Sequence, residues 1–101
     1  MSEQSPICVL VKLKVKDGTE EEFLGELGAV LAQVAQEPAC LSIHGYQDPE
    51  DPTGFLLIEI WSGREEFEEF DGNREYLHSY IERAKLLWAE PRDRTFWQEV
   101  V

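Results

Sequence analysis

The sequence is poor in basic residues and in cysteine. Its 101 residues include 9 Lys and Arg against 21 Asp and Glu, which gives a formal net charge of −12 at pH 7. Nucleic acid and anionic lipid repel such a chain, so we expect neither class of partner. Two cysteines, Cys8 and Cys40, are too few for a disulfide framework, and their apolar neighbours predict buried thiols.

The sequence also lacks a long hydrophobic run, and the start MSEQSPI lacks the basic and apolar segments of a signal peptide. We therefore expect no membrane association and a cytoplasmic location. Zinc, phosphate-loop, dinucleotide and serine-nucleophile motifs are absent. The acidic cluster of Asp48, Glu50 and Asp51 lacks calcium-loop spacing and is interleaved with two prolines, which indicates a rigid turn rather than a metal site.

Hydrophobic periodicity predicts an alternation of strands and helices. Residues 7–15 alternate as a strand does, and the turn at 16–18 leads to a helix that Thr19 and Glu22 begin as a capping box. Glu37-Pro38 ends that helix. Residues 40–47 and 55–61 form an antiparallel hairpin around a loop at 48–54.

The second half predicts two further helices and a strand. Ser62 and Glu65 form a capping box for a short helix, which Asp71-Gly72-Asn73 interrupts. A longer helix extends to Pro91, and residues 95–101 form a final strand rich in aromatic and β-branched residues. One face of the longer helix is apolar and includes Tyr76, Leu77, Tyr80, Ile81, Ala84, Leu87 and Trp88.

The order β-α-β-β-α-β is that of a ferredoxin-like α+β fold, an antiparallel sheet with helices on one face, within a single domain of residues 1–101. The first and third strands are central in this fold, and both are apolar on both faces. The helices cover one face. We expect a second copy of the chain to cover the other, so the sequence predicts a homodimer through the sheet face. Glu59 and Trp61 then point toward the helices, and Ile58 and Ile60 toward the partner.

Two segments, EPACLSIHGYQDPEDPTGFLLIEIWSGREEFEEF and LKVKDGTEEEF, resemble the antibiotic biosynthesis monooxygenase family of the dimeric α+β barrel superfamily. The shared features are Glu37-Pro38 followed by Cys40-Leu41, the Asp48-Pro49 loop, and Glu59-x-Trp61 followed by Phe67. The resemblance covers nearly the whole chain. It implies a small homodimer that oxidises a small phenol, quinol or polyketide-type substrate with O₂ and with no cofactor.

The chain also departs from that family pattern. Many members carry a histidine at the position that matches Phe70, and another is common near the position that matches Glu75. Haem-degrading relatives use an asparagine, a tryptophan and a histidine where this chain has Val11, Phe70 and Tyr80. These departures disfavour haem degradation. They leave open a non-catalytic barrel that binds a small ligand, and a small isomerase or stress protein on the same fold.

Cofactor-free oxygenation needs a base and a dry aromatic pocket. Glu59 and His44 are the candidate catalytic groups. Glu59 lies on a central strand, where it is either paired with Lys12, Lys14 or His44 or has a raised pKa. His44, which shares a strand face with Ser42 and Tyr46, is either a satisfied structural histidine or lies near the pocket or the dimer face.

Five residues are candidates for the substrate pocket, and each also has a purely structural interpretation. They are Trp61, Phe70, Tyr76, Tyr80 and His78. For the aromatic residues, a core position beneath the helices is the first interpretation and a pocket lining the second. His78 lies at helical spacing from Arg74, Asp71 and Glu82, so surface pairing is its structural alternative.

Overall fold

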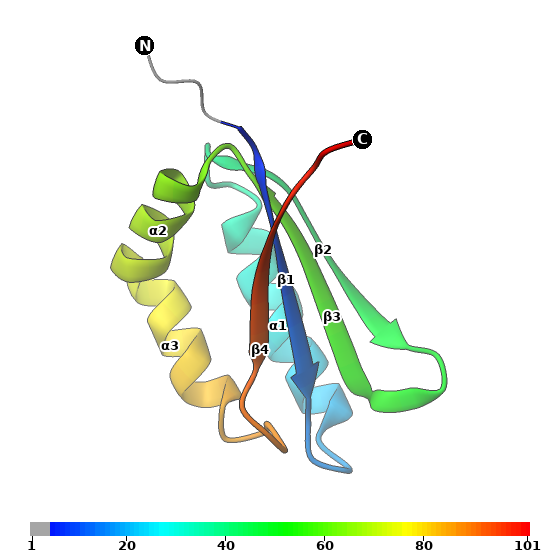
Figure 1. Ribbon diagram of the computed structural model, residues 1–101. Helices are drawn as coiled ribbons and strands as arrows, with labels where there is room; N and C mark the ends of the chain where they lie inside the picture. The colour runs from blue at the N-terminus through cyan, green and yellow to red at the C-terminus, as the bar shows by residue number, and fades with distance from the viewer. Residues whose placement is uncertain (1–4) are drawn as a thin grey trace.

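The computed structural model describes residues 5–101, which form a four-stranded antiparallel sheet and three helices (Figure 1). In chain order the elements are β1 (Ile7–Lys14), α1 (Glu20–Val34), β2 (Cys40–Asp48), β3 (Asp51–Trp61), α2 (Arg64–Asn73), α3 (Glu75–Ala84) and β4 (Asp93–Gln98). The strand order is β2-β3-β1-β4. This order confirms the predicted ferredoxin-like fold, with the first and third strands in the centre.

The sheet has a helix-covered face and an open face, because side chains alternate along each strand. On the covered face, Val9 of β1 lies opposite Glu59 of β3. On the open face, Leu10 lies opposite Ile58. Figure 1 shows α1 behind the sheet and α2 and α3 continuing on that side toward β4. This confirms the prediction that Glu59 and Trp61 face the helices, whereas Ile58 faces the opposite side of the sheet.

One hydrophobic core lies between the covered face and the helices. α1 packs tightly against β2 at Gly45, since a Cβ atom there would lie 3.5 Å from both Leu27 and Leu31. The buried apolar side chains are Val9, Val11, Leu13, Val15, Phe23, Leu27, Val30, Val34, Phe55, Leu57, Trp61, Phe67, Phe70, Leu77, Tyr80 and Ala84.

The open face is also largely apolar. Leu10, Leu56 and Ile58 lie at its centre, and large aromatic side chains flank them, with Tyr46 52% and Trp97 56% exposed. Cys8 and Cys40 are both free thiols. The prediction that they are buried is wrong, because both are only partly buried.

Neither predicted capping box forms. The Thr19 hydroxyl donates to the carbonyl of Lys16 at 2.7 Å instead of accepting from α1, and no side chain caps that helix. At the second helix, the backbone N–H of Ser62 donates to the carbonyl of Ala39 at 2.9 Å. This bond continues the strand pairing past Trp61, so α2 begins later, after Gly63.

The breaks in the second half also differ from the prediction. α2 continues through Asp71-Gly72-Asn73, and the chain turns instead at Arg74, whose backbone is extended (φ −97°, ψ 112°). α3 ends at Ala84 rather than near Pro91, because residues 85–89 fold back onto the end of β1. There the carbonyl of Leu87 accepts from the backbone N–H of Lys16 at 2.8 Å, and Trp88 bridges Val15.

The strand limits shift for similar reasons. Residues 48–54 are mostly strand rather than loop, because β2 extends to Asp48 and β3 begins at Asp51. Their connection is a rigid turn, as predicted, in which the Asp48 carboxylate accepts from the backbone N–H of Glu50 at 2.8 Å. Lys14 binds Asp51 at 2.7 Å and fixes this start of β3. β4 is Asp93–Gln98 and thus begins and ends earlier than the predicted 95–101.

Candidate active site

A buried carboxylate faces the helices near the end of β3. Glu59 is only 8% exposed, and its cross-strand neighbours Val9 and Ile43 are apolar. The indole N–H of Trp61 donates to Glu59 Oε1 at 2.9 Å, which is possible because residues two apart on a strand share a face. No cation within residues 5–101 forms an ion pair with Glu59 at salt-bridge distance.

The surroundings of Glu59 oppose its ionisation. Burial raises the pKa of the Glu59 carboxyl above its ordinary value. The indole N–H of Trp61 and the more distant guanidinium groups of Arg94 and Arg92 lower it in part. A carboxyl group with a raised pKa is a stronger base than an exposed glutamate, so this group is suited to accept a proton.

Aromatic rings hold Trp61 in place. Trp61 is fully buried, its ring centroid lies 4.5 Å from that of Phe70, and Phe67 packs edge-on at 5.5 Å. Phe67 in turn packs edge-on against Phe96 of β4 at 5.5 Å. Because these rings pack around the indole, they favour the orientation in which the N–H of Trp61 points at the carboxylate.

Two arginines approach the same region from β4 and the residues before it. Arg94 forms two hydrogen bonds with the Asp71 carboxylate, at 3.0 and 3.2 Å, so its charge is neutralised. Arg92 stacks near the Trp88 ring, with its guanidinium carbon 5.9 Å from the ring centroid. Burial lowers the pKa of Arg92. Within residues 5–101 Arg92 has neither a hydrogen-bond acceptor nor an ion pair.

These groups surround a small cavity of about 40 Å³ between sheet and helices. Glu59, Arg92 and Arg94 supply its polar wall, and Tyr80 and Trp88 supply aromatic wall. The remaining lining is largely apolar and comprises Val11, Leu13, Val30, Leu31, Val34, Ile43, Leu57, Phe70, Asp71 and Leu77. The volume is close to the ~30 Å³ that one molecule occupies in liquid water, so an aromatic ring needs these walls to move apart.

A larger hollow of about 410 Å³ lies outside the Trp61–Phe70 pair, beside the connection between α1 and β2. Its wall is fixed by Glu37, which binds Arg74 through two hydrogen bonds of 3.0 Å and accepts from the Tyr76 hydroxyl at 2.6 Å. Because Trp61 and Phe70 are both buried, they separate this hollow from the region of Glu59.

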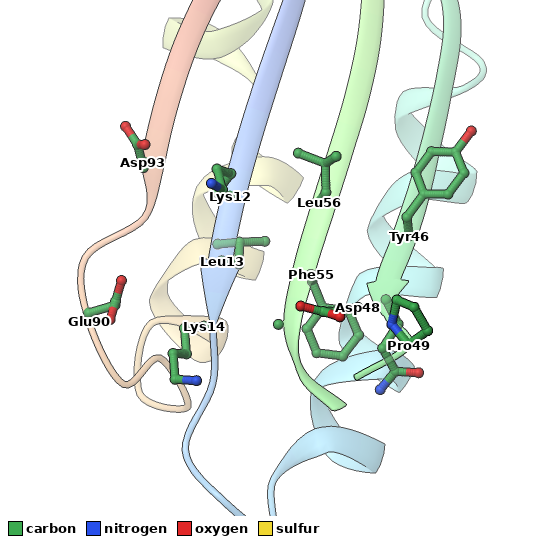
Figure 2. A pocket seen from close by; sticks show the side chains of 12 residues that line it. Lys12, Leu13, Lys14, Tyr46, Asp48, Pro49, Phe55, Leu56, Glu90 and Asp93 are labelled. Carbon is green, nitrogen blue, oxygen red and sulfur yellow. The ribbon is translucent and has the colours of Figure 1, made fainter. Parts of the chain in front are cut away.

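A third hollow, of about 560 Å³, lies on the open face of the sheet (Figure 2). Lys12 and Leu56 lie on its floor, between Asp93 on one side and Tyr46 on the other. Its size is typical of a ligand pocket, yet it lies across the sheet from Glu59.

Comparison with known proteins agrees with this arrangement. The family model for antibiotic biosynthesis monooxygenases matches residues 6–80. The chain belongs to the antibiotic biosynthesis monooxygenase family. A search of curated proteins found no match to this sequence.

Solved structures of antibiotic biosynthesis monooxygenase proteins and others share the fold. A protein from Pseudomonas aeruginosa is 21% identical, with a TM-score of 0.89 and full coverage of both chains. A Mycobacterium tuberculosis protein is 21% identical, with a TM-score of 0.86 over 96% of this chain and 97% of its own. A mutant of SnoaB, a cofactor-independent oxygenase from Streptomyces nogalater, is 13% identical, with a TM-score of 0.83 over 94% of this chain and 93% of its own.

The structure brings together some of the residues predicted for an antibiotic biosynthesis monooxygenase site. Glu59, Phe70 and Tyr80 line the 40 Å³ cavity, and Trp61 supports Glu59 from behind. Tyr76 instead lies outside both helix-side hollows, bound to Glu37.

The two histidines lie elsewhere. His44 is exposed on the open face, opposite Ile58, so the sheet separates it from Glu59. His78 is also exposed, and its Nε2 lies 3.0 Å from the carbonyl oxygen of Asp71 rather than from an acidic or basic side chain. Arg74, one of its predicted partners, binds Glu37 and Glu69 instead.

The predicted cation partners of Glu59 are wrong. Lys14 binds Asp51 and Thr53, and both Lys12 and His44 lie on the open face. The alternation of the strands is the reason, because residues with the parity of Lys12 and Lys14 point away from Glu59.

Sequence reasoning missed Arg92 and Arg94. A signal was available, because two arginines at strand spacing precede an aromatic strand in a chain with few basic residues. Spacing alone does not place that segment beside Glu59, since the β1–β4 pairing, which sets Arg94 opposite Val11, is a tertiary contact.

Neither a metal centre nor a membrane-spanning helix emerges from the geometry of residues 5–101. Within residues 5–101, no three His, Cys, Asp or Glu side chains gather closely enough to hold a metal ion. Among the helices of that same range, none combines the length and the apolar character needed to cross a bilayer.

Proposed function

We propose that this protein is a cofactor-independent monooxygenase that oxidises a small phenolic, quinol or polyketide-type substrate with O₂ beside Glu59. The observation that carries the proposal is the buried Glu59, which Trp61 holds and which faces a cavity. Among the residues that the structure describes, the other charged group of this cavity without an ion pair is Arg92. Membership of the antibiotic biosynthesis monooxygenase family supports the same reaction class.

The charges of the cavity suit such a reaction. Glu59 accepts the phenolic proton, and the resulting phenolate takes over the role of balancing Arg92. The phenolate passes one electron to O₂, which gives a phenoxyl radical and superoxide, and their recombination forms the new C–O bond. Glu59 returns its proton to the peroxide, the O–O bond breaks, and the carbon that bears the peroxide loses its remaining hydrogen, so that one oxygen atom leaves as water and the other stays as a carbonyl. In the keto form of the substrate, the net change is that a CH₂ group and O₂ give a carbonyl and H₂O.

Oxygen uptake tests the proposal directly. We expect consumption of O₂ with at least one member of a panel of quinols and polycyclic phenols, and a loss of about 100-fold or more in Glu59→Gln. Glu68→Gln is the matched control, because Glu68 is exposed and pairs with Arg64 on the surface of α2. Absence of uptake across the panel, or full activity in Glu59→Gln, contradicts the proposal.

The dimer is part of the proposal. The open face carries Leu10, Leu56, Ile58 and Trp97, and it includes Lys12 and Lys14, with Asp93 opposite Lys12, in a chain of net charge −12. A face of this kind suits contact with a second acidic copy. We expect light scattering to give twice the chain mass of 11.7 kDa and Ile58→Asp to give a monomer. Leu24→Asp, on the exposed side of α1, is the control that remains dimeric.

A cytoplasmic location also belongs to the proposal. Cys8 and Cys40 are both unpaired thiols, which suits a reducing compartment. Cell fractionation of the native host tests this, and recovery in the membrane or extracellular fraction contradicts it.

A second candidate function is non-catalytic binding of a small ligand, as in a stress-related role. The observation that favours it is the contrast between the 40 Å³ cavity beside Glu59 and the 560 Å³ hollow on the open face. Saturable binding of a panel compound without O₂ consumption, lost in Leu56→Asp but retained in Glu59→Gln, identifies this alternative.

A further inference from the structure

The 40 Å³ cavity is too small for an aromatic ring but of suitable size for a diatomic gas. Most of its wall is aliphatic, from Val30, Leu31 and Val34 of α1 and from Ile43 and Leu57 of the sheet. Apolar cavities of this kind take up apolar gases more readily than water, because water needs several polar partners.

One part of the wall is different, because it offers hydrogen-bond donors. The indole N–H of Trp88 is buried and has no acceptor within residues 5–101. Arg92 lines the same cavity and lies against the Trp88 ring; it is only partly buried, and it has no acceptor in that range. Arg94, by contrast, is fully engaged by Asp71. Donors without an acceptor beside an aliphatic wall suit a molecule that enters neutral and becomes an anion.

We propose that this cavity is the dioxygen subsite, in which Trp88 and Arg92 stabilise the superoxide that forms by electron transfer. This inference rests on the proposed oxygenase function and adds to it a place for O₂ in the closed cavity, whereas the larger aromatic substrate reaches Glu59 only when the walls of the cavity move apart. The substrate donates the electron, O₂ accepts it, and Arg92 balances the negative charge that moves from the phenolate to the oxygen.

The order of charges explains why the subsite lies next to Glu59. While Glu59 is ionised, its charge offsets part of that of Arg92 across the cavity, beside the larger contribution of Asp71. Once Glu59 has taken the substrate proton, the carboxyl is neutral, and Arg92 then attracts an anion. Formation of superoxide is therefore favoured only after the substrate has been deprotonated. This order limits the reduction of O₂ that is not coupled to oxygenation of the substrate.

Dissolved O₂ tests the subsite without any substrate. Paramagnetic O₂ broadens the NMR signals of nearby groups, so methyl signals of Val34 and Leu31 are expected to broaden more than those of Val9. Val9 is the matched control, because it is fully buried but does not line the cavity. Val34→Ile adds one methyl group to the cavity wall. In this variant the methyl signals of Leu31 are expected to broaden no more than those of Val9. Equal broadening at Val9 and Val34 overturns the proposal.

Kinetics tests the two donors once a substrate is known. Trp88→Phe retains a ring but loses the N–H, and we expect kcat/KM for O₂ to fall about tenfold, with the KM of the aromatic substrate unchanged. Arg92→Met is expected to lower kcat/KM for O₂ about 100-fold. Unchanged O₂ kinetics in both variants overturns the role of the donors. If no substrate is found, the proposed oxygenase function fails, whereas O₂ broadening still decides whether the cavity binds O₂.

Discussion

Trp61→Phe is the substitution that best tests the link between Glu59 and its support. Phenylalanine keeps an aromatic ring between Phe67 and Phe70 but removes the indole N–H that lies 2.9 Å from Glu59 Oε1. A hydrogen bond to a charged group contributes about 1.5–3 kcal/mol, which is an upper bound on how far it favours the ionised form of Glu59, because a neutral carboxyl also accepts from the indole N–H. We therefore expect the pKa of Glu59 to rise further above its ordinary value.

The consequence for activity depends on pH. At a pH below the pKa of Glu59, a smaller fraction of the carboxyl is ionised in the variant than in the wild type. The loss of up to about 1.5–3 kcal/mol corresponds to a fall of up to about 10- to 100-fold in that fraction and therefore in kcat/KM. At higher pH the base is ionised in both proteins and the difference diminishes. The KM of the aromatic substrate is expected to change little, because Trp61 does not line the cavity of Glu59.

Stability provides a readout that needs no substrate. The folded pKa of Glu59 lies above the unfolded value, so the folded protein holds this proton more tightly. The free energy of unfolding therefore falls as pH rises from the unfolded pKa to the folded pKa. Trp61→Phe is expected to make that fall larger in urea titrations at a series of pH values. A direct carbon NMR titration of the Glu59 carboxyl measures the same shift.

Phe67→Leu is the matched control. Phe67 is buried and packs edge-on against the indole, so its loss weakens packing but leaves the hydrogen bond intact. We expect this variant to be destabilised by a similar amount at every pH. If Trp61→Phe also loses the same free energy at every pH, and its activity profile is not displaced, Trp61 has no effect on the ionisation of Glu59 and the reasoning is refuted.

Three further predictions concern the surroundings of the site. Glu37→Gln is expected to lower the free energy of unfolding at pH 7 by about 1–3 kcal/mol, measured with urea, because an amide cannot bind Arg74 through two charged hydrogen bonds. Arg74 holds the pKa of Glu37 below its ordinary value, so the extra stability of the wild type should disappear as pH falls through the pKa of Glu37 in the folded protein. A difference in unfolding free energy between wild type and variant that stays constant with pH contradicts this. Phe70→Ala should cost about 3–5 kcal/mol and join the 410 Å³ hollow to the cavity of Glu59, which calorimetry and a crystal structure can check; an unchanged melting temperature refutes it. His44→Ala should leave O₂ uptake unchanged, because the sheet separates His44 from Glu59; lost uptake in a variant that keeps the wild-type mass contradicts that placement.

The sequence was sufficient for the order of the elements and for the faces of the strands. The apolar alternation of β1 and β3 fixes which residues share a face, since side chains along a strand alternate regardless of its neighbours. For that reason the prediction that Glu59 and Trp61 face the helices, while Ile58 faces away, needed no tertiary information.

Element ends were less accessible, because long-range hydrogen bonds decide them. Ser62 fits a capping box by local pattern, yet its N–H is used by the carbonyl of Ala39. Asp71-Gly72-Asn73 fits a helix break, yet the chain turns at Arg74, where Glu37 and Glu69 bind the guanidinium. Local propensities are weaker than such contacts.

The composition and periodicity of this sequence by themselves determined an acidic α+β domain with a buried carboxylate and tryptophan on one strand face. Only the tertiary structure decided which groups surround Glu59. Strand pairing places Arg94 opposite Val11, and the return of residues 85–89 to β1 places Trp88 and Arg92 at the same cavity. These residues lie more than 25 positions from Glu59 in the chain, so no local pattern specifies their distance from it.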